Sequence, residues 1–220
     1  MVPLPKLIGQ LAEDLELIDL VVAIDCAMHE HHVRLEDLVE AIRPRQRGGP
    51  RLRAALSLSD GRSESAWESI LRLVYQLCGF TRIRPQQVIR DARDAIVARA
   101  DLALLGTNRI SEYDGADHRG REQHQSDLRR EKALSRLGIE RYGYTKSEIV
   151  DQPATIARDA EAAFGMPHNP SRLANWHYEF ERSTLSYSGW NRYLRRLHRF
   201  TGAGGRQPRI RSTPQLREPG

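Results

Sequence analysis

Residues 96–114 contain two short apolar segments that both carry acidic side chains. The first segment, 96–105, includes Asp101, and the second, 109–114, includes Glu112 and Asp114. The Gly-Thr-Asn sequence between them is typical of a β-hairpin. Side chains two residues apart in a strand face the same side, so Glu112 and Asp114 are expected to project together. If Asp101 faces that side too, the three carboxylates offer a hard-oxygen site for Mg²⁺ or Mn²⁺.

Three carboxylates close together repel one another when no cation is present. At least one of them is therefore expected to have a raised pKa in the metal-free protein. Addition of Mg²⁺ or Mn²⁺ is expected to raise the thermal stability of the chain, because the ion binds the folded state only.

The segments around this hairpin predict an α/β domain over residues 63–164. Its expected elements are, in chain order, a helix over 65–78, strands over 82–90, 96–105 and 109–114, a helix over 121–137, a strand over 139–144 and a helix over 146–164. Short turns join the first three strands, which predicts an antiparallel meander. The fourth strand follows a helix and is expected to run parallel to the third. The predicted architecture is a mixed β-sheet flanked by helices.

Three amphipathic segments precede this domain. Helices are expected over 7–17, 19–30 and 35–42, and together they predict a helical N-terminal subdomain over residues 1–43. The sequence that follows is rich in Arg, Gly and Pro, which predicts a linker over 44–62.

Cysteine content and the N-terminus bear on the compartment. Two cysteines, Cys26 and Cys78, do not make a disulfide framework, and both are expected to be buried free thiols of a reducing compartment. No signal-peptide pattern follows Met1, and no apolar run is long enough to span a bilayer. A cytoplasmic protein is expected.

Positive charge is concentrated at the C-terminal end of the chain. Ten Arg and three acidic residues give residues 165–220 a charge of +7, so residues 1–164 carry −2 of the net +5. The same segment holds seven of the fourteen aromatic residues. Arginine interleaved with aromatic side chains suits phosphate contact and base stacking, which makes Arg195, Arg196 and Arg199 candidate DNA contacts. One alternative is a solvated end that is disordered after residue 201. Another is that Trp176, Phe180 and Trp190 pack back onto the body of the protein as a terminal helix.

Four consecutive stretches carry a family resemblance. They are SESAWESILRLVYQLCGF at 63–80, ARADLAL at 98–104, ISEYDGADHRGREQHQSDLRREKALSRLG at 110–138 and IERYGYT at 139–145. In combination they resemble the PD-(D/E)xK nuclease superfamily, in particular a bacterial endonuclease-like domain family of unknown function related to very-short-patch-repair endonucleases. Residues 1–43 resemble the connecting region of AbiEi-type antitoxin-like proteins.

The resemblance implies a restriction-endonuclease-like core that hydrolyses DNA phosphodiester bonds with a bound divalent metal. Asp101 and Glu112 would hold the ion directly, and Asp114 would be a further ligand. Glu68 has two possible roles: the acid that the preceding helix contributes to such sites, or the partner of Ser65 in a helix capping box. The basic residues expected to contact phosphates near the site are Arg82, Arg84, Arg129 and Arg130.

Two positions depart from the superfamily pattern. Ala100 precedes Asp101 where the pattern has Pro, and Asp114 stands where the pattern has Lys. A Lys there would supply a cation next to the reacting phosphate. His118 is the expected substitute, as the group that takes or delivers the proton. The alternative function is a nuclease-like protein with weak or no activity that binds DNA or a partner toxin in a defence or toxin–antitoxin system.

Overall fold

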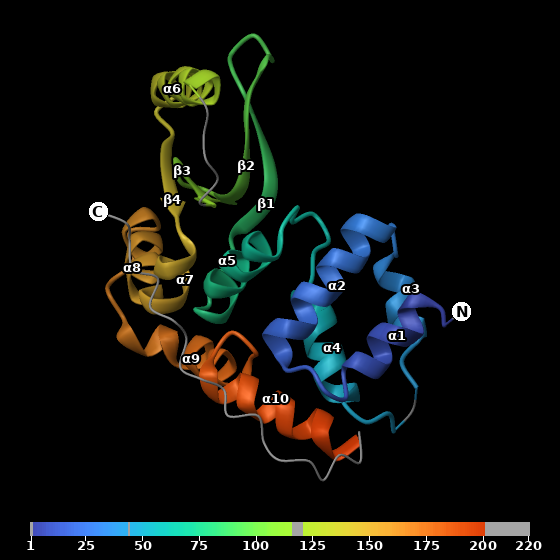
Figure 1. The fold of residues 1–220 in the computed structure, drawn as a ribbon. Coiled ribbons are helices and arrows are strands. Elements are labelled where there is room, and N and C mark those ends of the chain that lie inside the picture. The colour runs from blue at the N-terminus through green and yellow to red at the C-terminus, as the bar shows by residue number, and fades with distance from the viewer. Residues whose placement is uncertain (1, 44, 116–120, 201–220) are drawn as a thin grey trace.

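The computed structural model describes residues 2–43, 45–115 and 121–200, without the side chains of 121–126 and 198–200. Four helices form a layer on one side of the molecule (Figure 1). They are α1 (Leu4–Leu11), α2 (Leu17–His31), α3 (Leu35–Glu40) and α4 (Gly49–Leu58). Helix α2 is the central element of this layer, because it packs against α1, α4 and the following helix α5 (Ala66–Leu77).

A four-stranded mixed sheet follows α5. Its strands, in spatial and chain order, are β1 (Ile83–Arg90), β2 (Ile96–Leu104), β3 (Arg109–Tyr113) and β4 (Glu140–Tyr144). The first two pairings are antiparallel, and β4 runs parallel to β3 after the crossover helix α6 (Arg121–Arg136). The predicted mixed sheet flanked by helices is therefore confirmed.

Helices α5 and α6 cover opposite faces of the sheet. On the α5 side, the Tyr75 hydroxyl lies 2.6 Å from the Ser111 hydroxyl of β3. On the α6 side, Leu134 packs in a small apolar cluster with Ile110. Ser111 and Ile110 are adjacent in β3, and adjacent side chains in a strand face opposite ways.

The predicted linker over 44–62 is wrong for the residues that form α4. Leu52, Ala55 and Leu56 are buried there, at the spacing of one helix face. Pro50 lies in the first turn, where its missing N–H leaves no hydrogen bond unmade. Gly48 precedes the helix with φ +71°, and a Cβ there would lie 2.0 Å from the Ala12 carbonyl oxygen. The Gly-Pro sequence therefore starts a helix instead of preventing one.

The helix expected over 146–164 is interrupted. It consists of α7 (Lys146–Asp151) and α8 (Pro153–Ala163), with Gln152 between them at φ −130° and ψ 40°. Proline disfavours helical backbone in the residue before it, so Pro153 ends one helix and begins the next.

The expected C-terminal extension over 165–220 is also partly wrong. Residues 170–200 form a 3₁₀ turn, Pro170–Leu173, and two helices, α9 (Ala174–Arg182) and α10 (Tyr187–Phe200). Trp176 is fully buried in the main core and stacks on Phe180, with ring centroids 5.6 Å apart. This stretch is thus an integral layer beneath the body of the molecule in Figure 1. The expectation of disorder after 201 falls outside the described residues.

A charged pair lies at the centre of the core. Asp25 of α2 and Arg72 of α5 form an ion pair, and each side chain is 1% exposed. Asp25 also accepts hydrogen bonds from the Ser69 hydroxyl at 2.7 Å and from the Asp60 backbone N–H at 2.9 Å. The apolar core around this pair extends from Ile8 to Trp176.

Cys78 is a buried free thiol, as expected, whereas Cys26 is exposed, which corrects the prediction for that residue. Burial raises the pKa of the Cys78 thiol to about 12. Within the described ranges, no helix is both long and apolar enough to cross a membrane.

Replacement of Asp25 by Ala would leave the Arg72 guanidinium buried without its counterion. We expect Asp25→Ala to lower the free energy of unfolding by about 3–5 kcal/mol, measured by urea denaturation. The matched control is Glu13→Ala, which removes the exposed Arg47–Glu13 pair and should leave the unfolding midpoint nearly unchanged. Similar small shifts for both variants would contradict the structural role of the buried pair.

Candidate functional site

The strand register sets two of the predicted acids next to each other. Leu102 of β2 pairs with Ser111 of β3, so the preceding residue Asp101 lies opposite Glu112. Directly opposed side chains in an antiparallel pair share one face of the sheet. Both acids line the same cavity, on the face that α6 covers.

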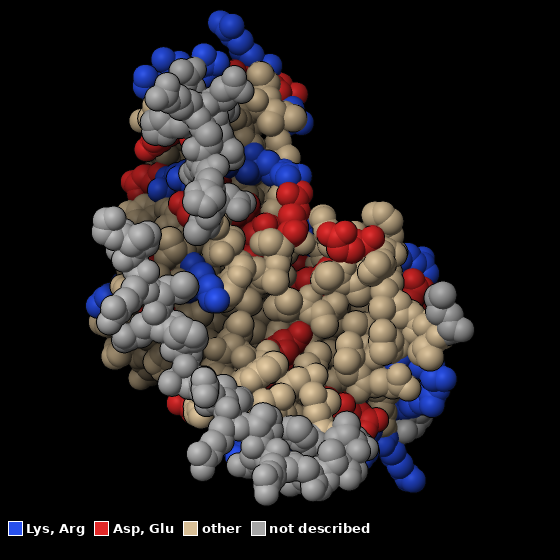
Figure 2. Space-filling model, viewed as in Figure 1, with Lys and Arg blue, Asp and Glu red and all other residues tan. Residues whose placement is uncertain are grey.

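This cavity has a volume of about 400 Å³ and charged walls. Its lining comes from β2, β3, β4 and α6, and comprises Arg99, Asp101, Glu112, Tyr113, Asp114, Asp127, Leu128, Arg130, Glu131 and Arg141. In Figure 2, acidic and basic side chains lie side by side in the upper part of the molecule, where Figure 1 places these elements. The combination of carboxylates and guanidinium groups suits a ligand that carries both anionic and cationic parts.

Two arginines bind the acids in this arrangement. Glu112, only 4% exposed, pairs with Arg130 of α6 and accepts a bond of 2.5 Å from Nε of Arg141 in β4. Nη2 of Arg141 donates to Asp114 at 2.7 Å. Arg130 also donates to the carbonyl oxygen of Arg99 at 3.0 Å. The carboxylates of Glu112 and Asp114 are therefore held by guanidinium groups.

Arg141 was missed by the sequence analysis, although a signal was present. It is a basic residue in the middle of the predicted fourth strand, directly after Glu140. The parallel pairing sets it beside Ile110, on the face that also carries Glu112. A charged residue at that register, next to an acid of the neighbouring strand, predicts an ion pair.

Gly143 makes room for the acid at the end of β3. It pairs with Glu112, and a Cβ at Gly143 would lie 1.8 Å from Oδ2 of Asp114. The Asp114 carboxylate thus packs directly against the backbone of β4, where any larger residue would displace it.

Asp101 differs from the other two acids in its environment. It accepts a hydrogen bond of 2.9 Å from the backbone N–H of Tyr113. Burial raises its pKa to about 6, and the negative charges of Glu68 and Glu112 add to the effect. The expectation of a raised pKa is confirmed for this residue, with burial as the larger cause.

Glu68 acts in the expected helix cap with Ser65, and its carboxylate reaches back to the backbone of Glu64. Its backbone N–H donates to the Ser65 hydroxyl at 3.2 Å, and its carboxylate accepts from the Glu64 backbone N–H at 2.9 Å. The same carboxylate accepts from the Gln86 amide at 2.8 Å. Glu68 does not line the cavity, but its charge acts on Asp101.

Gln86 was not singled out in the sequence. It has φ +50°, which non-glycine residues rarely adopt, at the strand position opposite Asp101.

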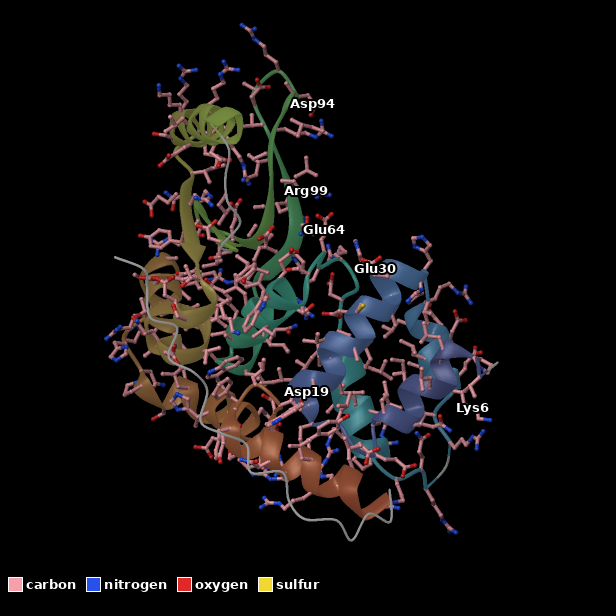
Figure 3. All side chains as sticks on the ribbon, in the orientation of Figure 1. Lys6, Asp19, Glu30, Glu64, Asp94 and Arg99 are labelled. Atoms are coloured by element: carbon pink, nitrogen blue, oxygen red, sulfur yellow. The ribbon has the colours of Figure 1, made fainter. Side chains whose placement is uncertain are left out.

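A further ion pair fixes the hairpin to the start of α5. Arg99 of β2 binds Glu64 at 2.7 Å, and Figure 3 shows the two side chains meeting between the hairpin and the segment before α5. Because the Arg99 carbonyl also binds Arg130, this residue connects α5 and α6 through β2.

Of the arginines expected to contact DNA, one lines the cavity, namely Arg130. Arg129 is exposed on α6. Arg82 lies over the Phe164 ring, 4.7 Å from its centroid, and Arg84 lies 3.3 Å from the Gln87 amide oxygen.

The C-terminal arginines differ in their exposure and in their contacts. Arg195 is exposed on α10, whereas Arg196 binds Glu16 and the carbonyl oxygen of Asp14. Arg196 therefore fastens α10 to the start of α2. The side chain of Arg199 and the whole of His118 lie outside the described residues.

Carboxylate oxygens are ligands that Mg²⁺ prefers. In this structure, however, the carboxylates of Glu112 and Asp114 are bound to arginines. No group of three or more His, Cys, Asp or Glu side chains is arranged to hold a metal ion in the part of the chain whose side chains are described. Glu112 and Asp114 could serve an ion only after their arginines leave.

Comparisons of this chain with protein-family models, curated proteins and solved structures found no match.

The raised pKa of Asp101 predicts a pH-dependent gain from its removal. Between its usual value of 3.8 and about 6, the folded state keeps the proton that the unfolded chain releases, so the contribution of Asp101 to stability is lost as pH rises. Asp101→Asn stays neutral and can still accept from Tyr113. We expect the free energy of unfolding of this variant to exceed that of the wild type by up to about 3 kcal/mol at pH 7.5. The difference should vanish near pH 4. A gain that is equal at both pH values would contradict the raised pKa.

Proposed function

We propose that the protein is a metal-dependent phosphodiester hydrolase that acts on DNA, built on a restriction-endonuclease-like core. The observation that carries the proposal is the pairing of Asp101 and Glu112 on neighbouring strands, in the wall of a cavity that also presents Arg130 and Arg141. The element order of helix, three antiparallel strands, helix and parallel strand supports the proposed core.

The candidate site residues have distinct roles under this proposal. Asp101 and Glu112 would hold Mg²⁺ or Mn²⁺, with Asp114 as a third ligand and Glu68 acting from further away. Such an ion lowers the pKa of a bound water and offsets the negative charge of the phosphodiester. His118 would take or deliver the proton.

Binding of DNA would come from basic side chains around the cavity and on α10. Arg84, Arg129 and Arg195 are exposed and available to phosphates. Contacts of this kind do not read sequence, and they weaken as salt rises because each one releases counterions.

A second candidate is a nuclease-like protein that binds DNA or a partner toxin without cutting. The observation that favours it is the occupation of Glu112 and Asp114 by arginines, together with an acid at the position where the superfamily has Lys. The two candidates differ in whether DNA is cleaved when it is bound.

We expect the purified chain to cut plasmid and short duplexes in Mg²⁺ or Mn²⁺ and not in EDTA. The double variant Asp101→Ala, Glu112→Ala should lose cleavage, because it removes both proposed ligands. Glu140→Gln is the matched control: it changes an acid of β4 that binds Arg109, outside the cavity, and should leave cleavage intact.

Cleavage that persists in the double variant would contradict the assigned site. Binding of the duplex in a gel-shift assay without cleavage, under every metal condition, would favour the second candidate.

A further inference from the structure

A second cavity lies between α2 and the segment that leads into α5. Its volume is about 340 Å³, which is within the range of small-molecule binding sites. One wall is a stripe of α2 residues from Asp19 to Glu30, and the other wall comes from residues 63–69. We propose that this cavity, called the α2–α5 groove below, binds a linear aliphatic polyamine in its protonated form. The proposal does not depend on the proposed function.

The middle of the α2–α5 groove is narrow and has little charge. Val22, Ala23 and Cys26 line it from α2, at the three- and four-residue spacing that places side chains on one face of a helix. Ala66 lies in the opposite wall, at the start of α5. These side chains are small, so a chain of methylene groups can lie between the two walls, where contact with apolar surface is favourable.

Acidic side chains lie towards both ends of the groove. Asp19 and Glu30 are eleven positions apart on α2, which separates them by roughly 16 Å along the helix axis. In Figure 3, Glu64 lies near Glu30, and Asp19 lies further along α2. Figure 2 shows acidic side chains at these places, separated by uncharged surface. Among the described residues that line the groove, none is Lys or Arg. The groove is therefore complementary to a cation.

Several polar groups of the groove have no partner in the described part of the chain. Ser63 lines the groove and is only 5% exposed, yet its hydroxyl makes no hydrogen bond there. A buried hydroxyl without a partner is costly. The Glu30 carboxylate, at the rim, likewise has no hydrogen bond or ion pair within the described ranges. A bound N–H donor would satisfy these oxygen atoms.

Asp19 is held in place but lacks a cation. Its carboxylate accepts from the Thr184 backbone N–H at 3.0 Å and from the Thr184 hydroxyl at 2.7 Å. Burial raises the pKa of Asp19, against the effect of these hydrogen bonds. An ammonium group beside Asp19 would supply the missing positive charge. At the other end Glu64 is already paired with Arg99, at 2.7 Å, so Glu30 is the acid available there.

The arrangement of the acids identifies the kind of cation. The carboxylates are spread along the groove and, like the other side chains that the structure describes, are not gathered around one point where a metal ion could bind. A polyamine instead carries ammonium groups at intervals along a methylene chain, and each terminal ammonium donates three hydrogen bonds. When one end has bound, the other end is held near the second acid, which raises its effective concentration.

The first test measures binding of spermidine to the full chain by calorimetry. We expect spermidine to bind at least about tenfold more tightly than butylamine, which has a single ammonium group and can contact only one end of the groove. We also expect it to bind more tightly than hexaamminecobalt(III), which carries the same charge without a methylene stem. Equal affinity for spermidine and either comparison compound would overturn the proposal.

Two isosteric variants test the acids. Glu30→Gln and Asp19→Asn should each weaken spermidine binding by about threefold or more, because each removes one carboxylate charge. Asn at position 19 can still accept from Thr184, so the fold should be retained. The matched control is Glu40→Gln, which neutralises an exposed acid of α3 outside the groove and should leave the affinity unchanged. Wild-type affinity in both Glu30→Gln and Asp19→Asn would contradict the proposal.

Cys26 reports where the amine binds. The chain has two cysteines, of which Cys26 is exposed and Cys78 is buried. Because Cys26 lines the groove, a bound polyamine should shield its thiol from iodoacetamide. At a spermidine concentration about ten times the Kd, alkylation of Cys26 should slow by about tenfold. An unchanged alkylation rate under conditions where calorimetry shows saturation would place the amine elsewhere and overturn the assignment.

Discussion

The ion pair between Asp25 and Arg72 fixes the helix on which the sheet rests. Asp25 belongs to α2 and Arg72 to α5, and both are buried, so the pair joins the N-terminal helices to the α/β part at the level of the core. A buried pair is costly to break, because either partner alone would be an uncompensated charge. The position of α5 against α2 is thereby determined.

Helix α5 in turn aligns the strand that carries the site. Tyr75 reaches Ser111, and Trp67 stacks on Tyr113 with ring centroids 5.8 Å apart. Both contacts hold β3 from the side opposite Glu112. Alternation along the strand then directs Glu112 to the α6 face. The core and the candidate site thus lie on opposite faces of the short strand β3.

Much of the sheet was predictable, because its information is local. The strand order was predicted from short apolar segments joined by short turns. The parallel pairing was predicted from the helix that precedes the last strand. The same pattern left open whether Asp101 faces the side of Glu112, and the register of β2 with β3 shows that it does. The element types of β1 to β4 and of α5 and α6 agree with the expectations, with boundaries differing by at most one residue.

The remaining features depend on contacts distant in sequence. Helix α4 has a Gly-Pro start that looks like a linker until Leu52 and Leu56 are seen in the core. Trp176 in a basic segment resembles a nucleic-acid contact, yet it is buried. Arg141 is a charged residue in a predicted strand, but its acidic partners could be identified only from the register of β4 with β3. These tertiary partners carry no local sequence pattern.

Diffraction from crystals grown with Mn²⁺ and a short phosphorothioate duplex tests the central claim most directly, because the anomalous signal of manganese locates the ion. The account predicts manganese between Asp101 and Glu112, with Arg130 and Arg141 turned onto a backbone phosphate. Duplex bound at the cavity with no manganese there, and with both arginines still on Glu112, would contradict it.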